Sequence, residues 1–227
     1  MNGLVVGVSG GLDSAVVAHL IKRAFPDNAL GVIMPVKSNP KDREDALRVI
    51  ESAQIDVLEI DLTNTHELLF NTINEKLKEK DDLNEDLLRL GDANLRTRLR
   101  MSTLYTVANN YRYLVCGTDN AAEWHIGYFT KYGDGGVDLN PLVHDTKRQV
   151  RELAAFLEVP RAIIEKEPSA GLWEGQTDED ELGTSYEVID AFLEGKDVPK
   201  YERTLIEKKH QQTEHKRQLP ATPEKFF

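Results

Sequence analysis

A short turn near the start of the chain combines the residue types that bind phosphate: Ser9-Gly10-Gly11-Leu12-Asp13-Ser14. Adjacent glycines permit positive φ values and let a ligand touch the backbone. A helical pattern begins near Ser14, so free N–H groups and the positive end of the helix dipole would face the turn and favour an anion. Asp13 would repel that anion unless a divalent cation lay between them, which a nucleotide with Mg²⁺ supplies. The alternative is a plain strand-to-helix connection in which Asp13 only stabilises the helix start.

Alternating strand and helix patterns position this turn. Apolar, β-branched runs predict strands at residues 4–8, 30–34, 57–60 and 113–116. Apolar residues at helical spacing predict helices over residues 15–25, 46–53 and 95–107. Because parallel strands need such long connections, we expect an α/β fold, a parallel sheet with helices on both faces.

Capping signals and loops organise the remaining segments. Three residue pairs have the spacing of a capping box and predict helix starts: Asn64 with Glu67, Thr146 with Gln149, and Thr184 with Glu187. Beyond residue 117, only the helix starting at Thr146 is clear, and the glycines between 127 and 136 indicate functional loops. We find no internal repeat and no low-complexity linker, so we expect a single domain over residues 1–227.

The composition excludes several classes of protein. With 28 Lys and Arg against 39 Asp and Glu, the net charge of -11 argues against a nucleic acid partner. The one cysteine, Cys116, makes an internal disulfide impossible and fits a reducing compartment. No apolar run approaches the roughly 18 residues of a membrane span, and the first residues lack a signal peptide pattern. We therefore expect a cytoplasmic protein with no membrane partner.

The complete turn resembles the pyrophosphatase-type loop of the N-type ATP pyrophosphatase superfamily. It differs from Walker A because no Gly-Lys-Ser/Thr follows. Four later segments, with residues 94–101, are similar to the ammonia-dependent NAD synthetase family: Gly117-Thr118-Asp119-Asn120-Ala121-Ala122-Glu123, residues 129–138, Thr146-Lys147-Arg148-Gln149 and residues 213–220. This resemblance runs in order from Gly3 to the C-terminus.

The resemblance implies an adenine-nucleotide alpha-hydrolase-like, Rossmann-like fold and a carbon–nitrogen ligase of NAD biosynthesis. Its partners would be ATP, deamido-NAD and ammonia, with Mg²⁺ as the cofactor, ATP as co-substrate and a second copy of the chain in a homodimer. The carboxylate of deamido-NAD would attack the α-phosphorus of ATP and release pyrophosphate. Ammonia would then displace AMP from the adenylate to give NAD.

The resemblance also assigns residues to roles. Asp13 and Glu123 match the catalytic magnesium ligands. The ATP contacts would be Gly7, Val8, Ser9, Gly10, Gly11, Leu12, Asp13, Ser14, Thr118, Lys147 and Ser169. The deamido-NAD contacts would be Arg98, Lys131, Asp138, His215 and Lys216.

Simpler roles remain open for several of these residues. Lys147 in a first helical turn opposes the helix dipole, which an anion nearby would explain, although an exposed lysine is tolerated there. Glu123 could be a solvated acid at a helix start. Residues 215–217 could be a solvated basic tail. Met34 could abut the adenine or belong to the core.

The arginines of one predicted helix cannot all serve one ligand. At about 100° per residue, Arg96 and Arg100 share a face and Arg98 does not. The resemblance selects Arg98 for deamido-NAD, which leaves Arg96 and Arg100 for ion pairs or a neighbouring subunit.

Two other kinds of function compete with an ammonia-dependent ligase. An enzyme that uses glutamine needs a hydrolytic nucleophile, whereas Cys116 lies in an apolar strand that predicts a buried, inert thiol. A glutaminase on another polypeptide stays open. A non-catalytic nucleotide-binding module would not require both Asp13 and Glu123. The chain departs from the family pattern at Leu12, Asn120 and Gly171, where relatives carry glutamine, histidine and an acid.

Overall fold

The computed structural model describes residues 1–168 and 178–224 of the chain. Its sheet is four-stranded and parallel, with the order β3-β2-β1-β4. The strands are β1 (Gly3–Gly7), β2 (Ala29–Ile33), β3 (Asp56–Glu59) and β4 (Tyr113–Cys116). Each lies within one residue of its predicted position, and the predicted parallel sheet is confirmed.

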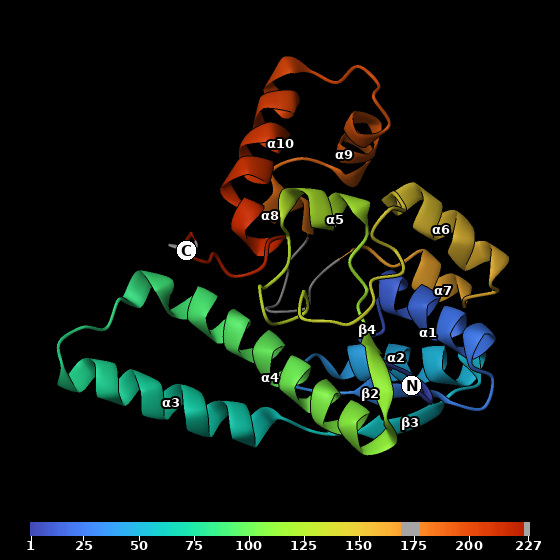
Figure 1. Ribbon diagram of the computed structural model, residues 1–227, viewed down its shortest axis with the longest axis horizontal. Helices are drawn as coiled ribbons and strands as arrows, with labels where there is room; N and C mark the ends of the chain where they lie inside the picture. The colour runs from blue at the N-terminus through green and yellow to red at the C-terminus, as the bar shows by residue number, and fades with distance from the viewer. Residues whose placement is uncertain (169–177, 225–227) are drawn as a thin grey trace.

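Helices cover both faces of this sheet (Figure 1). Val6 points into the core under the first group of helices and Val5 into the core on the other side, because successive strand residues face opposite ways. The first group is α1 (Leu12–Ala24), α2 (Pro40–Ala53), α6 (Lys147–Phe156) and α7 (Arg161–Ile164). The opposite face is covered by α4 (Leu88–Tyr111), against which α3 (Thr63–Glu79) packs after a loop with the short 3-10 helix η1 (Glu85–Leu87).

A third core lies beyond the end of β4. It joins the short helix α5 (Ala121–Ile126) to α9 (Tyr186–Leu193) and α10 (Lys200–Gln212). Figure 1 shows α8 (Asp178–Leu182), α9 and α10 gathered around α5, above the sheet. The 3-10 helix η2 (Glu214–Lys216) follows α10. The sequence reading missed α5 because six residues are too few for a helical period to show.

The capping predictions have mixed outcomes. The pair Thr146 and Gln149 forms the predicted capping box at the start of α6. The box predicted at Asn64 is wrong, because Asn64 lies inside α3 and the chain enters that helix one residue earlier. The box predicted at Thr184 is also wrong, because Ser185 caps α9 by accepting a hydrogen bond from the amide of Val188. The error at α9 comes from a neighbouring hydroxyl that serves equally well as a cap. At α3 the N-cap is Leu62, which makes no side-chain cap hydrogen bond.

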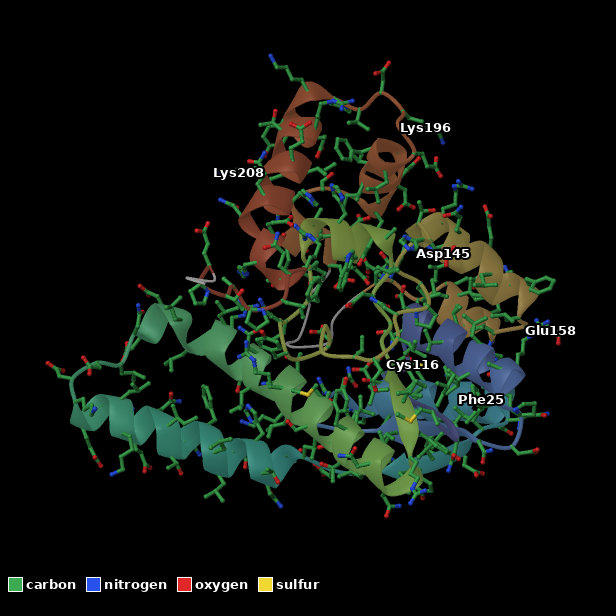
Figure 2. All side chains as sticks on the ribbon, in the orientation of Figure 1. Phe25, Cys116, Asp145, Glu158, Lys196 and Lys208 are labelled. Carbon is green, nitrogen blue, oxygen red and sulfur yellow. The ribbon has the colours of Figure 1, made fainter. Side chains whose placement is uncertain are left out.

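The predicted inert cysteine is confirmed. Cys116 is buried at the end of β4, where Figure 2 labels it, and burial raises the pKa of its thiol to about 12. The thiolate form is therefore scarce at neutral pH, which excludes this residue as an activated nucleophile. Among the described helices, none has both the length and the apolar character needed to cross a membrane.

Candidate active site

A cavity of about 1210 Å³ opens at the carboxyl ends of the strands. Ser9 after β1, Met34 after β2 and Thr118 after β4 all line it. In parallel sheets this edge is where ligands bind, because the loops after neighbouring strands converge there. The cavity is large enough for a nucleotide together with a second organic substrate.

The glycine turn after β1 forms one wall of this cavity. Gly10 has φ +81°, and a Cβ there would lie 2.7 Å from the backbone oxygen of Asp42 and 2.9 Å from the amide nitrogen of Ala46. Gly11, with φ -92°, is the N-cap of α1 and makes no side-chain cap. Only Gly10 therefore uses the conformational freedom predicted for both glycines. The first amides of α1 have no capping side chain and face the turn, as an anion site requires.

A buried lysine connects the turn to two other elements. Lys147 Nζ lies 2.6 Å from Asp13 Oδ2 and 3.4 Å from Glu123 Oε1, and only 2% of its side chain is exposed. Burial alone would lower the pKa of Lys147, but the two carboxylates outweigh burial and raise the pKa above its usual value. The alternative of an exposed, tolerated lysine is wrong. The anions that offset its unfavourable place in the helix dipole are these two side chains.

Glu123 serves the helix and the cavity with different oxygens. Its Oε2 accepts a hydrogen bond from the amide of Asn120, which completes a capping box for α5. Its Oε1 accepts a hydrogen bond of 2.7 Å from the hydroxyl of Tyr186. Burial raises the pKa of Glu123 to about 7, against the opposing charge of Lys147 and with a further contribution from Asp13. A solvated acid at a helix start is therefore the wrong description.

Two side chains that the sequence reading did not assign fix this arrangement. Asn120 donates a hydrogen bond of 2.9 Å to Asp13 Oδ1. Asp190 accepts hydrogen bonds from the amides of Lys147 and Arg148 at 3.1 and 2.9 Å, which anchors the start of α6. The pattern Asn-Ala-Ala-Glu, itself a capping signal, could have revealed the role of Asn120. No sequence signal relates Asp190 to a helix 42 positions away.

Two tyrosine hydroxyls donate hydrogen bonds to acidic side chains of α8. The hydroxyl of Tyr186 lies 3.0 Å from Asp178 Oδ2, and the hydroxyl of Tyr128 lies 3.2 Å from Asp178 Oδ1 and 2.7 Å from Glu181 Oε2. The Tyr186 ring also lies 4.6 Å from Lys147 Nζ, at the distance of a cation–π contact. Burial, with Glu123 and Asp178, raises the pKa of Tyr186 well above its usual value, so its hydroxyl keeps its proton.

Arg100 lines the same cavity. Its Nε donates a hydrogen bond of 3.1 Å to the backbone oxygen of Met34, and burial lowers the pKa of Arg100 to about 10. Met34 both lines the cavity and belongs to the core, so its core role is confirmed and its contact with the adenine stays a prediction. Arg96 instead pairs with Asp92 within α4. The helical period correctly separates Arg98 from these two, but it does not tell which face meets the cavity.

The residues assigned to the dinucleotide occupy several environments. Lys216 lines the cavity and donates hydrogen bonds to the backbone oxygens of Gly127 and Phe129, so residues 215–217 are not a solvated tail. Lys131 donates to the backbone oxygen of His215, which ties the loop after α5 to η2.

Arg98 and Asp138 do not line the cavity. The exposed Arg98 donates to the backbone oxygen of Lys131 at 3.4 Å. The carboxylate of Asp138 accepts from the hydroxyl of Tyr105 at 3.1 Å and from the amide of Val115 at 2.9 Å. Ser169, assigned to ATP, and Gly171 lie outside the described residues.

Most of the residues assigned to ATP line the one cavity: Gly7, Val8, Ser9, Gly11, Leu12, Asp13, Ser14, Thr118 and Lys147, together with Glu123. Gly10, where the backbone turns, is not among the lining residues. Asp13 and Glu123 converge on a single position, which the Lys147 ammonium contacts. The described residues contain no group of three or more His, Cys, Asp and Glu side chains that could hold a metal by itself. A cation held here would take its other ligands from a bound substrate or water.

This fold and this cavity define an α/β protein that binds a nucleotide at the carboxyl edge of a parallel sheet. A family model described as NAD synthase matches residues 1–220. The NH(3)-dependent NAD(+) synthetase of Alkaliphilus oremlandii (strain OhILAs) is 57% identical over 221 residues, covering 97% of this chain and 88% of that relative. The corresponding synthetase of Mycoplasmopsis pulmonis (strain UAB CTIP) is 49% identical, covering 97% and 82%.

Two solved structures share the fold of this chain. The NMN synthetase of Francisella tularensis superposes with a TM-score of 0.88 at 42% identity, covering 98% of this chain and 89% of that one. The NH3-dependent NAD synthetase of Campylobacter jejuni, in complex with the nitrate ion, gives a TM-score of 0.74 at 29% identity, covering 98% and 90%. The chain belongs to the NAD synthase family. It is a carbon–nitrogen ligase of NAD biosynthesis.

Proposed function

We propose that this enzyme converts deamido-NAD, ATP and ammonia into NAD, AMP and pyrophosphate. One observation carries the proposal: the glycine turn and the set of Asp13, Glu123 and Lys147 meet in one cavity at the head of α1. The amides of the turn suit phosphate, and the two carboxylates suit a hard cation beside it. A non-catalytic module would have no use for both carboxylates.

The chemistry requires activation of a carboxylate. A carboxylate oxygen of the nicotinate attacks the α-phosphorus of ATP, and the bond to pyrophosphate breaks. Ammonia then attacks the carbonyl carbon, and AMP leaves with the electron pair of the broken carbon–oxygen bond. The turn from Ser9 to Ser14 would bind the departing pyrophosphate, while Lys147 would offset the negative charge that builds on the phosphates.

The donor set fits Mg²⁺ at Asp13 and Glu123. Oxygen ligands suit this hard ion, which is usually held by one or two carboxylates plus substrate phosphates and water. The Lys147 ammonium contacts both carboxylates, so the two side chains already point to a common cation position. When bound, the ion would supply charge neutralisation at the phosphates. Asn120 and Tyr186 would hold the two carboxylates in place.

The dinucleotide would extend along the wall between α4 and η2. Arg98, Lys131, His215 and Lys216 would supply donors and positive charge for its diphosphate, and Lys216 already lines the cavity. Asp138 would have to exchange its contact with Tyr105 for one with the ligand. We also place Ser169 among the ATP contacts and treat residues 1–227 as one domain. The cytoplasm is the expected location, in keeping with the buried free thiol of Cys116.

A homodimer is part of this proposal. Leu69, Ile73 and Leu77 recur every four residues on α3, with exposed fractions of 40%, 43% and 36%. Leu68 beside them and Leu90 on α4 are more exposed still, at 74% and 58%. Figure 1 shows α3 and the start of α4 projecting from the sheet. Contiguous apolar surface of this kind is typical of an interface between subunits.

The surface predicts a dimer that a charge disrupts. Ile73→Glu should turn the dimer into a monomer in analytical ultracentrifugation. The matched variant Asn71→Glu, at an exposed position on the opposite side of the same helix, should remain dimeric. A wild-type monomer at micromolar concentration would contradict the dimer and leave the proposed reaction untouched.

The reaction is tested by its products. With ATP, Mg²⁺, deamido-NAD and ammonium, the enzyme should form NAD, AMP and pyrophosphate in equal amounts. Formation of ADP and orthophosphate would refute the proposed cleavage. Glutamine in place of ammonium should give no NAD. Nicotinate mononucleotide in place of deamido-NAD tests the substrate suggested by the Francisella tularensis NMN synthetase, and a larger kcat/KM for the mononucleotide would refute deamido-NAD as the preferred acid.

A further inference from the structure

Two acidic side chains of α2 lie beside the glycine turn. A Cβ at Gly10 would lie 2.7 Å from the backbone oxygen of Asp42 and 2.8 Å from the Cβ of Asp45. The turn therefore packs directly on the start of α2. Asp42, in the first turn of α2, complements the dipole of that helix, and it also lines the cavity. The same negative charge would repel the phosphates of a nucleotide bound at the glycine turn.

One ammonium contacts both of these carboxylates. Lys166 Nζ lies 2.9 Å from Asp42 Oδ1 and 2.9 Å from Asp45 Oδ2. Lys166 follows α7 and lines the cavity as well. Burial alone would lower the pKa of Lys166, but the hydrogen bonds and charges of the two acids outweigh burial and raise that pKa. Lys166 is therefore a charged group at neutral pH.

The two carboxylates differ in their other partners. Asp45, with 5% of its side chain exposed, also pairs with Arg48 Nη1 through Oδ1, at 3.0 Å. Asp42, with 29% of its side chain exposed, contacts no second cation within residues 1–168 and 178–224. Loss of Lys166 would therefore leave the Asp42 carboxylate without a counter-charge at the wall of the cavity.

We propose that Lys166 neutralises Asp42 and Asp45 and thereby allows the outer phosphates of ATP to bind at the glycine turn. This inference rests on the proposed function, which puts those phosphates at the turn. Lys166 acts through the two acids, so it is a positioning residue and not a ligand of the phosphates. Its ammonium lowers the negative charge of the cavity wall before the nucleotide arrives, which favours the binding of ATP over its release.

Removal of the cation should weaken the binding of ATP. Lys166→Met keeps most of the apolar length of the side chain and removes its charge. We expect the KM for ATP to rise about tenfold, the effect of one unpaired charge at a partly solvated distance, while kcat and the KM for deamido-NAD stay within about twofold. Lys166→Arg retains the charge and should stay within about threefold of wild type.

The control variant removes the same charge from the neighbouring helix. Arg161 lies on α7 and pairs with Glu165, and 87% of its side chain is exposed. Arg161→Met should therefore behave as wild type. A KM for ATP that rose equally in Arg161→Met and Lys166→Met would overturn the proposal, because the effect would then come from the net charge of the protein.

A second change at Asp42 separates neutralisation from direct contact with the phosphates. In the double variant Lys166→Met with Asp42→Asn, the uncompensated carboxylate is gone, so the KM for ATP should return to within about threefold of wild type. Asp42→Asn alone should leave that KM unchanged or lower it. If Lys166 bound the phosphates itself, the double variant would stay as impaired as Lys166→Met, and this result would overturn the proposal.

AMP provides a ligand without the two outer phosphates. In calorimetry with the full chain, Lys166→Met should weaken the binding of ATP about tenfold and the binding of AMP less than about twofold. Equal losses for the two nucleotides would indicate a distorted cavity and would refute a role specific to the outer phosphates.

Two further arms keep the test decisive. If circular dichroism shows that Lys166→Met does not fold, Lys166→Gln carries the same expectations. Absence of ATP binding in the wild-type enzyme would count against the proposed function itself. Normal ATP binding in wild type, with a KM for ATP unchanged by the loss of the Lys166 charge, would refute only the role of Lys166.

Discussion

Lys147 Nζ lies 2.6 Å from Asp13 Oδ2, although the two residues are 134 positions apart in the chain. The contact joins the start of α6 to the glycine turn at the head of α1. It also brings Glu123, at the start of α5, to within 3.4 Å of the same ammonium. Three helix starts thus meet at one buried charge cluster, so the active site and the packing of α1, α5 and α6 depend on the same contacts.

Removal of the lysine should therefore destabilise the fold. In Lys147→Met the two carboxylates lose their buried cation, and we expect a loss of about 3 to 5 kcal/mol in the free energy of unfolding. Urea denaturation of the nucleotide-free enzyme measures this loss. The control is Lys196→Met, because Lys196 pairs with Glu194 on the surface with 64% of its side chain exposed, and it should change stability by less than about 1 kcal/mol. Equal effects in the two variants would contradict a structural role for Lys147.

The Tyr186 hydroxyl should contribute through Glu123. Tyr186→Phe keeps the ring beside Lys147 and removes the donor 2.7 Å from Glu123 Oε1. A hydrogen bond to a charged group of this kind contributes about 1.5 to 3 kcal/mol. Urea denaturation should show a loss in that range, while Tyr201→Phe, on a side chain that is 73% exposed, should leave stability unchanged. If Tyr186→Phe left the free energy of unfolding unchanged, Glu123 would not depend on this donor.

The sequence could predict features that depend on neighbouring residues, such as the strands, but not contacts between residues far apart in the chain. The four β-branched runs and the Thr146 capping box depend on neighbouring residues, so local patterns were sufficient to locate them. Tyr186 and Glu123 are 63 positions apart, and their contact depends on how α9 packs against α5. Likewise, the helical period grouped Arg96 with Arg100, but only the packing of α4 shows that Arg100 faces the cavity. The family resemblance supplied what local patterns could not, namely the roles assigned to Asp13, Glu123 and Lys147.

The two glycines of the turn should respond differently to alanine. Gly10→Ala forces a Cβ to within 2.7 Å of the backbone oxygen of Asp42 at φ +81°, so α2 must shift or the turn must deform. We expect a loss of at least about 2 kcal/mol in thermal or urea unfolding. At Gly11, a Cβ meets only Ser9 Oγ, at 3.3 Å. Gly11→Ala should fold normally and raise the KM for ATP; equal stability losses in both variants would contradict this distinction.

The start of α9 offers a test of two adjacent hydroxyls. Ser185 Oγ accepts the Val188 amide, so Ser185→Ala should cost about 1 kcal/mol of stability. Thr184 Oγ1 is buried and has no hydrogen-bond partner among the described residues. Thr184→Val keeps the shape and removes that unpaired hydroxyl, so stability should be unchanged or higher. If urea unfolding instead showed a larger loss of stability for Thr184→Val than for Ser185→Ala, Thr184 would be the cap.

Acid should loosen the packing of α5 against α10. His125 stacks on the His210 ring at 4.2 Å, and burial, with the charges of His210 and Arg217, lowers the pKa of His125 from 6.5 to about 4. Between these two values the unfolded chain binds more protons than the folded chain. The contribution of His125 to stability is therefore complete above pH 6.5 and is lost as the pH falls towards 4, up to about 3 kcal/mol. Urea unfolding at several pH values should show a shallower acid loss in His125→Phe than in wild type. The variant His144→Asn, at an exposed histidine, should keep the wild-type slope, and equal slopes in all three proteins would show that His125 does not titrate with unfolding.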